Sequence, residues 1–335
     1  MKNSNNRLRA TPILLLTCLV WGLAFVFQIK SSESIPPLIF NGLRFTVGAL
    51  SMIPVAFLFE KQKKTVSVEV PEMHGATHSV KAILRYGFIS GVFLCIASGL
   101  QQYGCTFTQS AGLSGFLCGI YPLLTPLASF VAFRRKPSAG VFFGLFLAIG
   151  GLSLLTLFGL SSSGNTGTGT DWMWLGIPLL IGAAFFFAMQ MVSVDYAVER
   201  VNCLWFSFAQ FAVCAVLSLL LGLVFEYNGI TIAGKQAITA FTWRGVFEGI
   251  DGILYCGICS VGIGYTLQTV GQKMTDANYA AVIFNAEAVF AAIGGVLFGT
   301  DHINVIGYVG CALILSGIVL SEMLPVRSGA DRPAP

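Results

Sequence analysis

The sequence predicts an all-α integral membrane protein in which ten transmembrane helices form two inverted repeats of five helices. Three observations predict this fold: the apolar composition, ten long apolar runs and internal matches at a constant offset of 166 residues. Of the 335 residues, 55% are hydrophobic and only 10% are charged, whereas an average soluble domain carries about 25% charged residues. So few charges do not cover a soluble surface, which excludes a soluble enzyme, a nucleic-acid-binding protein and a disordered scaffold.

The apolar runs have the length that a membrane requires, because a spanning helix needs about 20 apolar residues. The runs lie at about 10–29, 37–59, 83–105, 111–133, 139–159, 172–194, 203–225, 248–270, 277–299 and 303–322. The first run lacks the small-residue cleavage pattern of a signal peptide, so we interpret it as a retained span. Within the run at 111–133, Pro122 and Pro126 predict a kink.

The basic residues predict the orientation. When the loops are assigned alternately to the two sides, 15 of the 19 Lys and Arg residues fall on one side and three on the other, while Arg44 lies within a span. Loops rich in Lys and Arg remain in the cytoplasm. We therefore expect both termini to be cytoplasmic, and the net charge of +4 to set orientation rather than to bind a partner.

The repeat divides the chain into two halves of five spans. At the offset of 166, Gly91 meets Gly257, Gln102 meets Gln268, and Phe59-Glu60 meets Phe225-Glu226. The predicted domains are a first repeat at 8–158, an external Gly/Ser/Thr-rich linker at 159–171, a second repeat at 172–324 and a cytoplasmic tail at 325–335. Because five is odd, the second half enters the membrane from the opposite side. Such inverted repeats are typical of secondary transporters that alternate access around a site near the membrane midplane.

Four motifs resemble one transporter family. They are Leu19-Val20-Trp21-Gly22, Pro37–Phe45 with its Arg44-Phe45 pair, Tyr121–Thr125, and Asn285–Ala292. In this order and over essentially the whole chain, they are similar to the drug/metabolite transporter superfamily of the EamA type. The resemblance implies transport of small organic solutes without implying one substrate. Ala288 replaces the usual proline of the last motif, so the motif does not predict a kink there.

Two charges within spans are the strongest candidates for function, because a charge at membrane depth is costly. Glu287 lies about 15 Å into its span and Arg44 about 10 Å into its own, at similar heights. We expect them to be partners or to flank one polar cavity. The repeat pairs Arg44 with Gln210 and Glu287 with Tyr121, so each charge occurs in one half only, which indicates contact with a ligand or ion. The alternative is a structural role, as an ion pair or as a bond from Arg44 to helix carbonyls. We favour the structural role for Arg44 and the functional role for Glu287.

Other polar and aromatic residues complete the predicted substrate and coupling site. The candidates are Glu287, Arg44, Gln102, Tyr121, Tyr265, Gln268, Trp21 and Asn285. Many polar groups within spans make ordinary hydrogen bonds between helices, so about half of such residues are expected to line the pathway. A desolvated Glu287 would exchange a proton as the cavity alternates between the two sides.

Enzyme and channel alternatives lack their required residues. Gly112–Gly119 matches the serine motif of rhomboid intramembrane proteases, but His74, His78 and His302 all lie in loops, so no span supplies a general base. A channel would need a ring of repeated filter residues, and the sequence shows no such repeat. The sequence contains no metal-ligand cluster and no phosphate-binding loop, so we expect no cofactor and no catalytic activity.

The sequence thus predicts an exporter of a small, polar, amino-acid-like metabolite. Efflux of cationic or aromatic drug-like compounds is the alternative. The expected partners are the small-molecule substrate, the lipid bilayer and a proton, without nucleic acid, for a monomer or homodimer. We expect a multi-pass protein of a bacterial inner membrane.

Overall fold

The computed structural model describes residues 4–65, 79–134, 139–154, 158, 160–162, 172–232, 234–275, 277–298 and 301–323. Within them, six helices are long and apolar enough to cross a membrane, and a shorter apolar helix covers Val305–Gly317. Large apolar side chains on the outside of the bundle are exposed, among them Phe146, Val224 and Leu297 at 71–74%. The prediction of a multi-pass, all-α membrane protein is confirmed at this level.

The first part of the chain forms six helices in the described residues. They are α1 (Ser4–Ser32), α2 (Pro37–Thr65), α3 (Val80–Thr108), α4 (Ala111–Cys118), α5 (Tyr121–Phe133) and α6 (Ala139–Leu154). Ser110 caps α4 by accepting a hydrogen bond from the Leu113 backbone N–H. The predicted span at 111–133 is two helices, because α4 ends at Cys118 and α5 begins at Tyr121. Pro122 occupies the start of the second helix, where a missing N–H costs nothing.

The second part contains more helical segments and two small sheets. The helices are α7 (Met173–Val198), α8 (Cys203–Phe225), α9 (Trp243–Glu248), α10 (Ile250–Leu254), η2 (Tyr255–Tyr265), α11 (Thr266–Met274), α12 (Ala277–Phe284), α13 (Ala286–Leu297) and α14 (Val305–Met323). Strand β1 (Leu160–Ser162) pairs with β4 (Asp301–Ile303), and β2 (Ile230–Ile232) forms a hairpin with β3 (Lys235–Ile238). Most of the predicted linker, residues 163–171, lies outside the described residues.

Two interruptions in the second part were not predicted. The span at 277–299 breaks at Asn285, between α12 and α13, although no proline is present. The span at 248–270 contains η2, an 11-residue π-helix. Wide helical turns of this kind are frequent at functional sites, and both interruptions adjoin the central cavity described below.

Close packing of small residues joins the helices. Helix α3 packs against α7 and α8, α2 against α8, α6 against α14, and α1 against α13. An ideal Cβ at Gly22 would lie 2.7 Å from the backbone nitrogen of Ala291, so glycine is required where α1 meets α13. In lipid, such contacts replace the hydrophobic effect as the force between helices.

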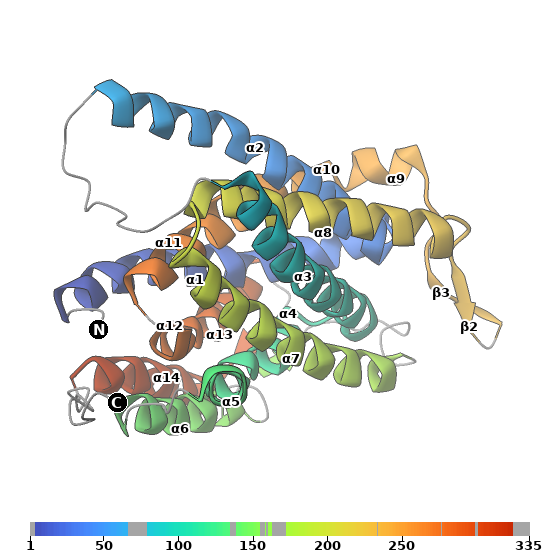
Figure 1. Ribbon diagram of the computed structural model, residues 1–335. Coiled ribbons are helices and arrows are strands. Elements are labelled where there is room, and N and C mark those ends of the chain that lie inside the picture. The colour runs from blue at the N-terminus through green and yellow to red at the C-terminus, as the bar shows by residue number, and fades with distance from the viewer. Residues whose placement is uncertain are drawn as a thin grey trace.

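The ends of the bundle are distinct (Figure 1). The first turn of α1 and the last turn of α14 lie at one end, whereas the β2–β3 hairpin and α9 lie at the other. The polar residues described next come from helices that run between these two ends.

Candidate functional site

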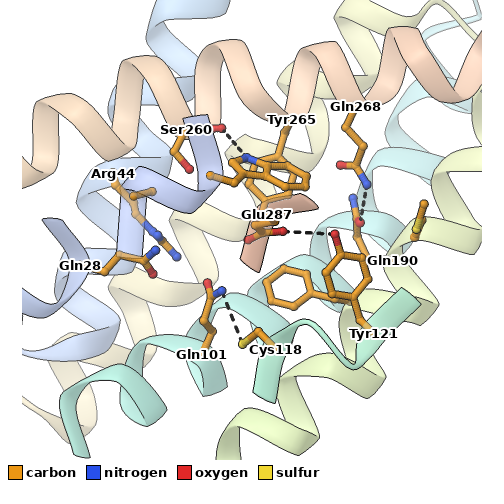
Figure 2. A pocket seen from close by; sticks show the side chains of 14 residues that line it. Gln28, Arg44, Gln101, Cys118, Tyr121, Gln190, Ser260, Tyr265, Gln268 and Glu287 are labelled. Carbon is orange, nitrogen blue, oxygen red and sulfur yellow. Dashed lines mark hydrogen bonds between the residues drawn. The ribbon is translucent and has the colours of Figure 1, made fainter. Parts of the chain in front are cut away.

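A narrow polar cavity lies in the centre of the bundle (Figure 2). Its lining residues are Trp21, Ala24, Gln28, Arg44, Gln101, Cys118, Tyr121, Phe187, Gln190, Met191, Ser260, Tyr265, Gln268 and Glu287. They come from α1, α2, α3, α4, α5, α7, η2, α11 and α13. The cavity has a volume of about 30 Å³, which is room for about two water molecules. The walls must therefore separate before a larger solute enters.

Glu287 enters the cavity from the first turn of α13, directly after the break at Asn285. Its side chain is buried, and the Tyr121 hydroxyl donates a hydrogen bond to Oε2 at 3.3 Å. The break matters electrostatically, because the N-terminus of a helix carries a partial positive charge that favours a carboxylate. Asn285 thus places Glu287 at a helix start inside the protein.

Arg44 enters from α2 and is only 3% exposed. Its Nε and Nη2 donate to the side-chain oxygen of Asn41 at 3.0 and 2.8 Å, and its Cζ lies 5.6 and 5.4 Å from the ring centres of Phe40 and Phe45. In the described part of the chain, no carboxylate lies within ion-pair distance of this guanidinium. Arg44 is therefore held in position by a neutral amide and retains its charge for another partner.

An aromatic wall faces these charges. The Trp21 indole N–H donates to the backbone oxygen of Ser260 in η2 at 3.1 Å, and its ring centre lies 4.6 Å from that of Tyr265 and 5.3 Å from that of Phe284. The π-helix therefore fixes the orientation of a cavity-lining indole through its backbone.

A row of amides forms another wall. Gln268 Nε2 donates to Gln190 Oε1 at 3.3 Å, Gln190 Nε2 donates to Gln210 Oε1 at 3.3 Å, and Ser90 donates to the same Gln210 oxygen at 2.9 Å. These groups are neutral, so they contribute hydrogen bonds without adding charge. They connect the cavity to the contact between α3 and α8.

The relatives of the chain decide its family. The profile of the EamA-like transporter family matches residues 9–157 and again 174–323. The chain belongs to this family.

Individual EamA relatives are distant but extend over most of the chain. Protein PagO of Salmonella typhimurium is 26% identical over 72% of this chain and 73% of its own. An uncharacterised transporter of Archaeoglobus fulgidus is 24% identical over 95% of this chain and 87% of its own, and the uncharacterised transporter YoaV of Bacillus subtilis is 21% identical over 90% and 93%. A solved crystal structure covers 93% of this chain and 96% of its own with a TM-score of 0.67 at 19% identity, which shows a shared fold.

The structure brings together most of the predicted site residues of this EamA protein. Trp21, Arg44, Tyr121, Tyr265, Gln268 and Glu287 all line the cavity. Arg44 and Glu287 both line it and form no ion pair with each other in the described residues.

The other two predicted residues do not line the cavity. Gln102 is buried beside it and donates to the Gln28 backbone oxygen at 3.1 Å. The Asn285 amide donates to the backbone oxygens of Ala281 and Val282, both at 3.1 Å. Asn285 bonds the last carbonyls of α12, so it shapes the helix break rather than contacting the cavity.

Sequence reasoning missed four polar lining residues: Gln28, Gln101, Gln190 and Ser260. For Gln28 a signal existed, because Trp21, Ala24 and Gln28 are spaced at i, i+3 and i+7 and therefore share one face of a helix. Gln190 and Ser260 each lie between apolar residues in the sequence, which gave no indication of which face of the helix turns toward the cavity. Within the described residues, no cluster of three or more His, Cys, Asp or Glu side chains exists that could hold a metal ion.

Proposed function

We propose that this protein is a secondary transporter that exports a small, zwitterionic, amino-acid-like metabolite by alternating access through the central cavity. The observation that carries the proposal is a buried Arg44 and a buried Glu287 that line one cavity without pairing in the described residues. A buried charge without a partner is unfavourable. A solute with a carboxylate and an ammonium group would neutralise both charges at once.

The proposed transporter consists of two inverted five-span halves, 8–158 and 172–324, which are joined by a linker at 159–171 and followed by a tail at 325–335. Reciprocal contacts support the inversion. An ideal Cβ at Gly257 would lie 2.7 Å from Val47 Cβ, and one at Gly91 would lie 2.7 Å from Val213 Cβ. Applying the 166-residue offset exchanges the two pairs, as expected for a two-fold axis.

The Glu287–Tyr121 hydrogen bond also supports an axis through the cavity. These residues are 166 positions apart, and symmetry-related positions touch only where they meet near the axis. A site on the axis is reached equally from both sides when the halves exchange conformations. The break at Asn285 has a counterpart 166 positions earlier, at Gly119 between α4 and α5, whereas η2 lies in the second half. These breaks supply walls that rearrange without unwinding a continuous helix.

Efflux of cationic aromatic compounds is the second candidate, and the aromatic wall favours it. Trp21, Tyr265 and Phe284 pack together beside Glu287, and aromatic faces attract cations. Such a solute would use Glu287 and the rings, and it would leave Arg44 without a role. Arg44 therefore separates the two candidates.

The test is counterflow of labelled solutes in proteoliposomes. With Arg44→Gln, the concentration of an amino-acid-like solute that gives half-maximal uptake should rise at least tenfold, because hydrogen bonds to charged groups contribute about 1.5–3 kcal/mol. Arg244→Gln is the matched control, since Arg244 is 89% exposed and pairs with Glu248 far from the cavity. Saturable counterflow of cationic aromatic compounds that is unchanged by Arg44→Gln would favour the second candidate. If no solute class shows counterflow, the protein is not a carrier.

In this proposal Glu287 also exchanges a proton during each cycle, in a multi-pass protein of a bacterial inner membrane with both termini in the cytoplasm. The charge asymmetry of the loops supports this orientation.

A further inference from the structure

A second cavity lies on the outer surface of the bundle, away from the central one. This groove has a volume of about 370 Å³ and lies between α3, α5 and α7. Helices α3 and α7 lie side by side along it (Figure 1). On α7, Gln190 and Met191 face the central cavity while Met189 and Val192 line the groove, so one helix separates the two spaces.

The groove is polar at one end and apolar at the other. Arg85 and Tyr86 of α3 and Tyr196 of α7 line the polar end, near the helix termini, whereas Phe93 and Met189 line the part nearer the middle of the same helices. From Arg85 to Phe93 the rise along α3 is about 12 Å. The groove therefore follows the direction of a lipid chain, from the interfacial level into the apolar layer.

The polar end carries positive charge that the described residues do not neutralise. Arg85 is exposed and has no carboxylate within ion-pair distance among them. Ala132 of α5 lines the same groove, and the exposed Arg134 follows it by two residues. The carboxylates of α7 and its C-cap at this end are Asp195, which is buried, and Glu199, which lies 3.8 Å from Arg200; neither forms an ion pair with Arg85 in the described residues.

The two tyrosines add the features of a membrane interface. Their ring centres lie 5.8 Å apart in an edge-on arrangement, and the Arg200 guanidinium lies 3.5 Å from the Tyr196 ring centre. Tyrosine is enriched at the level of lipid headgroups, where its ring is apolar and its hydroxyl is hydrated.

We infer that this groove is a binding site for one anionic phospholipid. Arg85 binds the phosphate, because a guanidinium fits two phosphate oxygens at once. One acyl chain lies along Ile89, Phe93 and Met189. The charge complementarity at Arg85 selects an anionic lipid over a zwitterionic lipid with the same chains.

Native mass spectrometry of the whole protein in a neutral detergent tests this site. The protein is titrated with phosphatidylglycerol or with phosphatidylcholine of the same chains. We expect phosphatidylglycerol to bind about fivefold more tightly, the ratio that corresponds to about 1 kcal/mol per basic residue near an anionic surface. Arg85→Gln should abolish the preference, and Arg85→Lys should retain part of it.

The controls separate the groove from general electrostatics and from other occupants. Arg9→Gln removes an exposed charge from the terminus of α1 and should leave the preference unchanged. Ile89→Trp should fill the groove and weaken phosphatidylglycerol binding; Ile89 is 42% exposed, so the larger ring can be accommodated. Equal binding of the two lipids, or an unchanged preference in Arg85→Gln, would overturn the inference. Inorganic phosphate competing at the same concentrations would point to a soluble anion, and a dimer lost in Ile89→Trp would point to a second copy of the chain.

Discussion

Arg44 and Glu287 are stabilised by different neighbours, although both are buried in the same cavity. Arg44 is held by the Asn41 amide, and Asn41 in turn donates to Ser98 and Ser218 at 3.0 and 2.9 Å. Glu287 accepts from Tyr121 at a helix start. Because neither charge is stabilised by the other in the described residues, removing one should leave the contacts of the other intact.

The first prediction follows for Glu287→Gln. The amide keeps the shape and accepts the Tyr121 hydrogen bond, so the thermal midpoint should change by less than a few degrees, while pH-dependent net transport should be lost. Adding Arg44→Gln should bring no recovery of stability, in contrast to a true ion pair. Transport assayed at several pH values checks this, with the exposed Glu248→Gln as control. Wild-type pH dependence in Glu287→Gln would remove this carboxyl from coupling.

At the residue scale, charge in an apolar run was the informative signal. Arg44 and Glu287 were predictable because their cost in a membrane requires a reason. Gln102 and Asn285 looked equally polar in the sequence, but their amides bond backbone oxygens. A neutral amide can satisfy itself on a helix carbonyl or face a cavity, and the sequence does not distinguish these outcomes.

At the scale of elements, η2 and α1 depend on each other. An ideal Cβ at Gly264 would lie 2.5 Å from Trp21 Nε1. Gly264→Ala should therefore displace the indole, break its bond to Ser260 and cost about 1–3 kcal/mol, as overpacked cores do. Gly150→Ala is the control: nothing lies within 4 Å of its ideal Cβ, and alanine is the better helix former. Thermal midpoints in detergent should fall for the first variant and remain level or rise for the second; equal midpoints would contradict the contact.

A second element-scale prediction concerns the start of α2. Glu226 follows the last residue of α8, is fully buried, and accepts from the backbone N–H groups of Leu38 and Ile39 at 2.9 and 3.3 Å. Burial raises the pKa of Glu226 to about 7, against the opposite effect of hydrogen bonds from Tyr103 and the two N–H groups. The folded protein thus binds this proton more tightly than the unfolded chain.

The sign of the pH effect follows from linkage. With an ordinary pKa of 4.5 and a folded pKa of about 7, the stabilisation is complete below 4.5 and is lost as the pH rises through 7. The thermal midpoint should therefore fall between pH 5 and 8, by the equivalent of up to about 3 kcal/mol. Glu226→Gln should show a flatter profile over this range. Parallel profiles of the two proteins would show that Glu226 does not titrate there.

Elements were predictable where a simple apolar run was long, and unpredictable where tertiary contacts set the geometry. The start of α2 at Pro37 and the span of α8 at 203–225 follow from composition and capping. The π-helix does not, because its wide turns are stabilised by Trp21, which is more than 230 positions away. The breaks within spans likewise need the neighbouring helices that accept them.

At the scale of the whole molecule, the orientation in the membrane is the prediction with the strongest basis in the sequence. Fifteen basic residues against three should place the loop between the halves outside. The first turn of α1 and the last turn of α14 lie at the same end of the bundle (Figure 1), as an even number of crossings requires. Alkaline phosphatase inserted within 163–171 should be active, because it folds only outside the cytoplasm, whereas the same insertion within 66–78 should be inactive. The reversed pattern would show that the protein has the opposite orientation in the membrane. Activity at both positions would mean an even number of crossings between them instead of the predicted three, and that would contradict the ten-span arrangement and the inverted repeat.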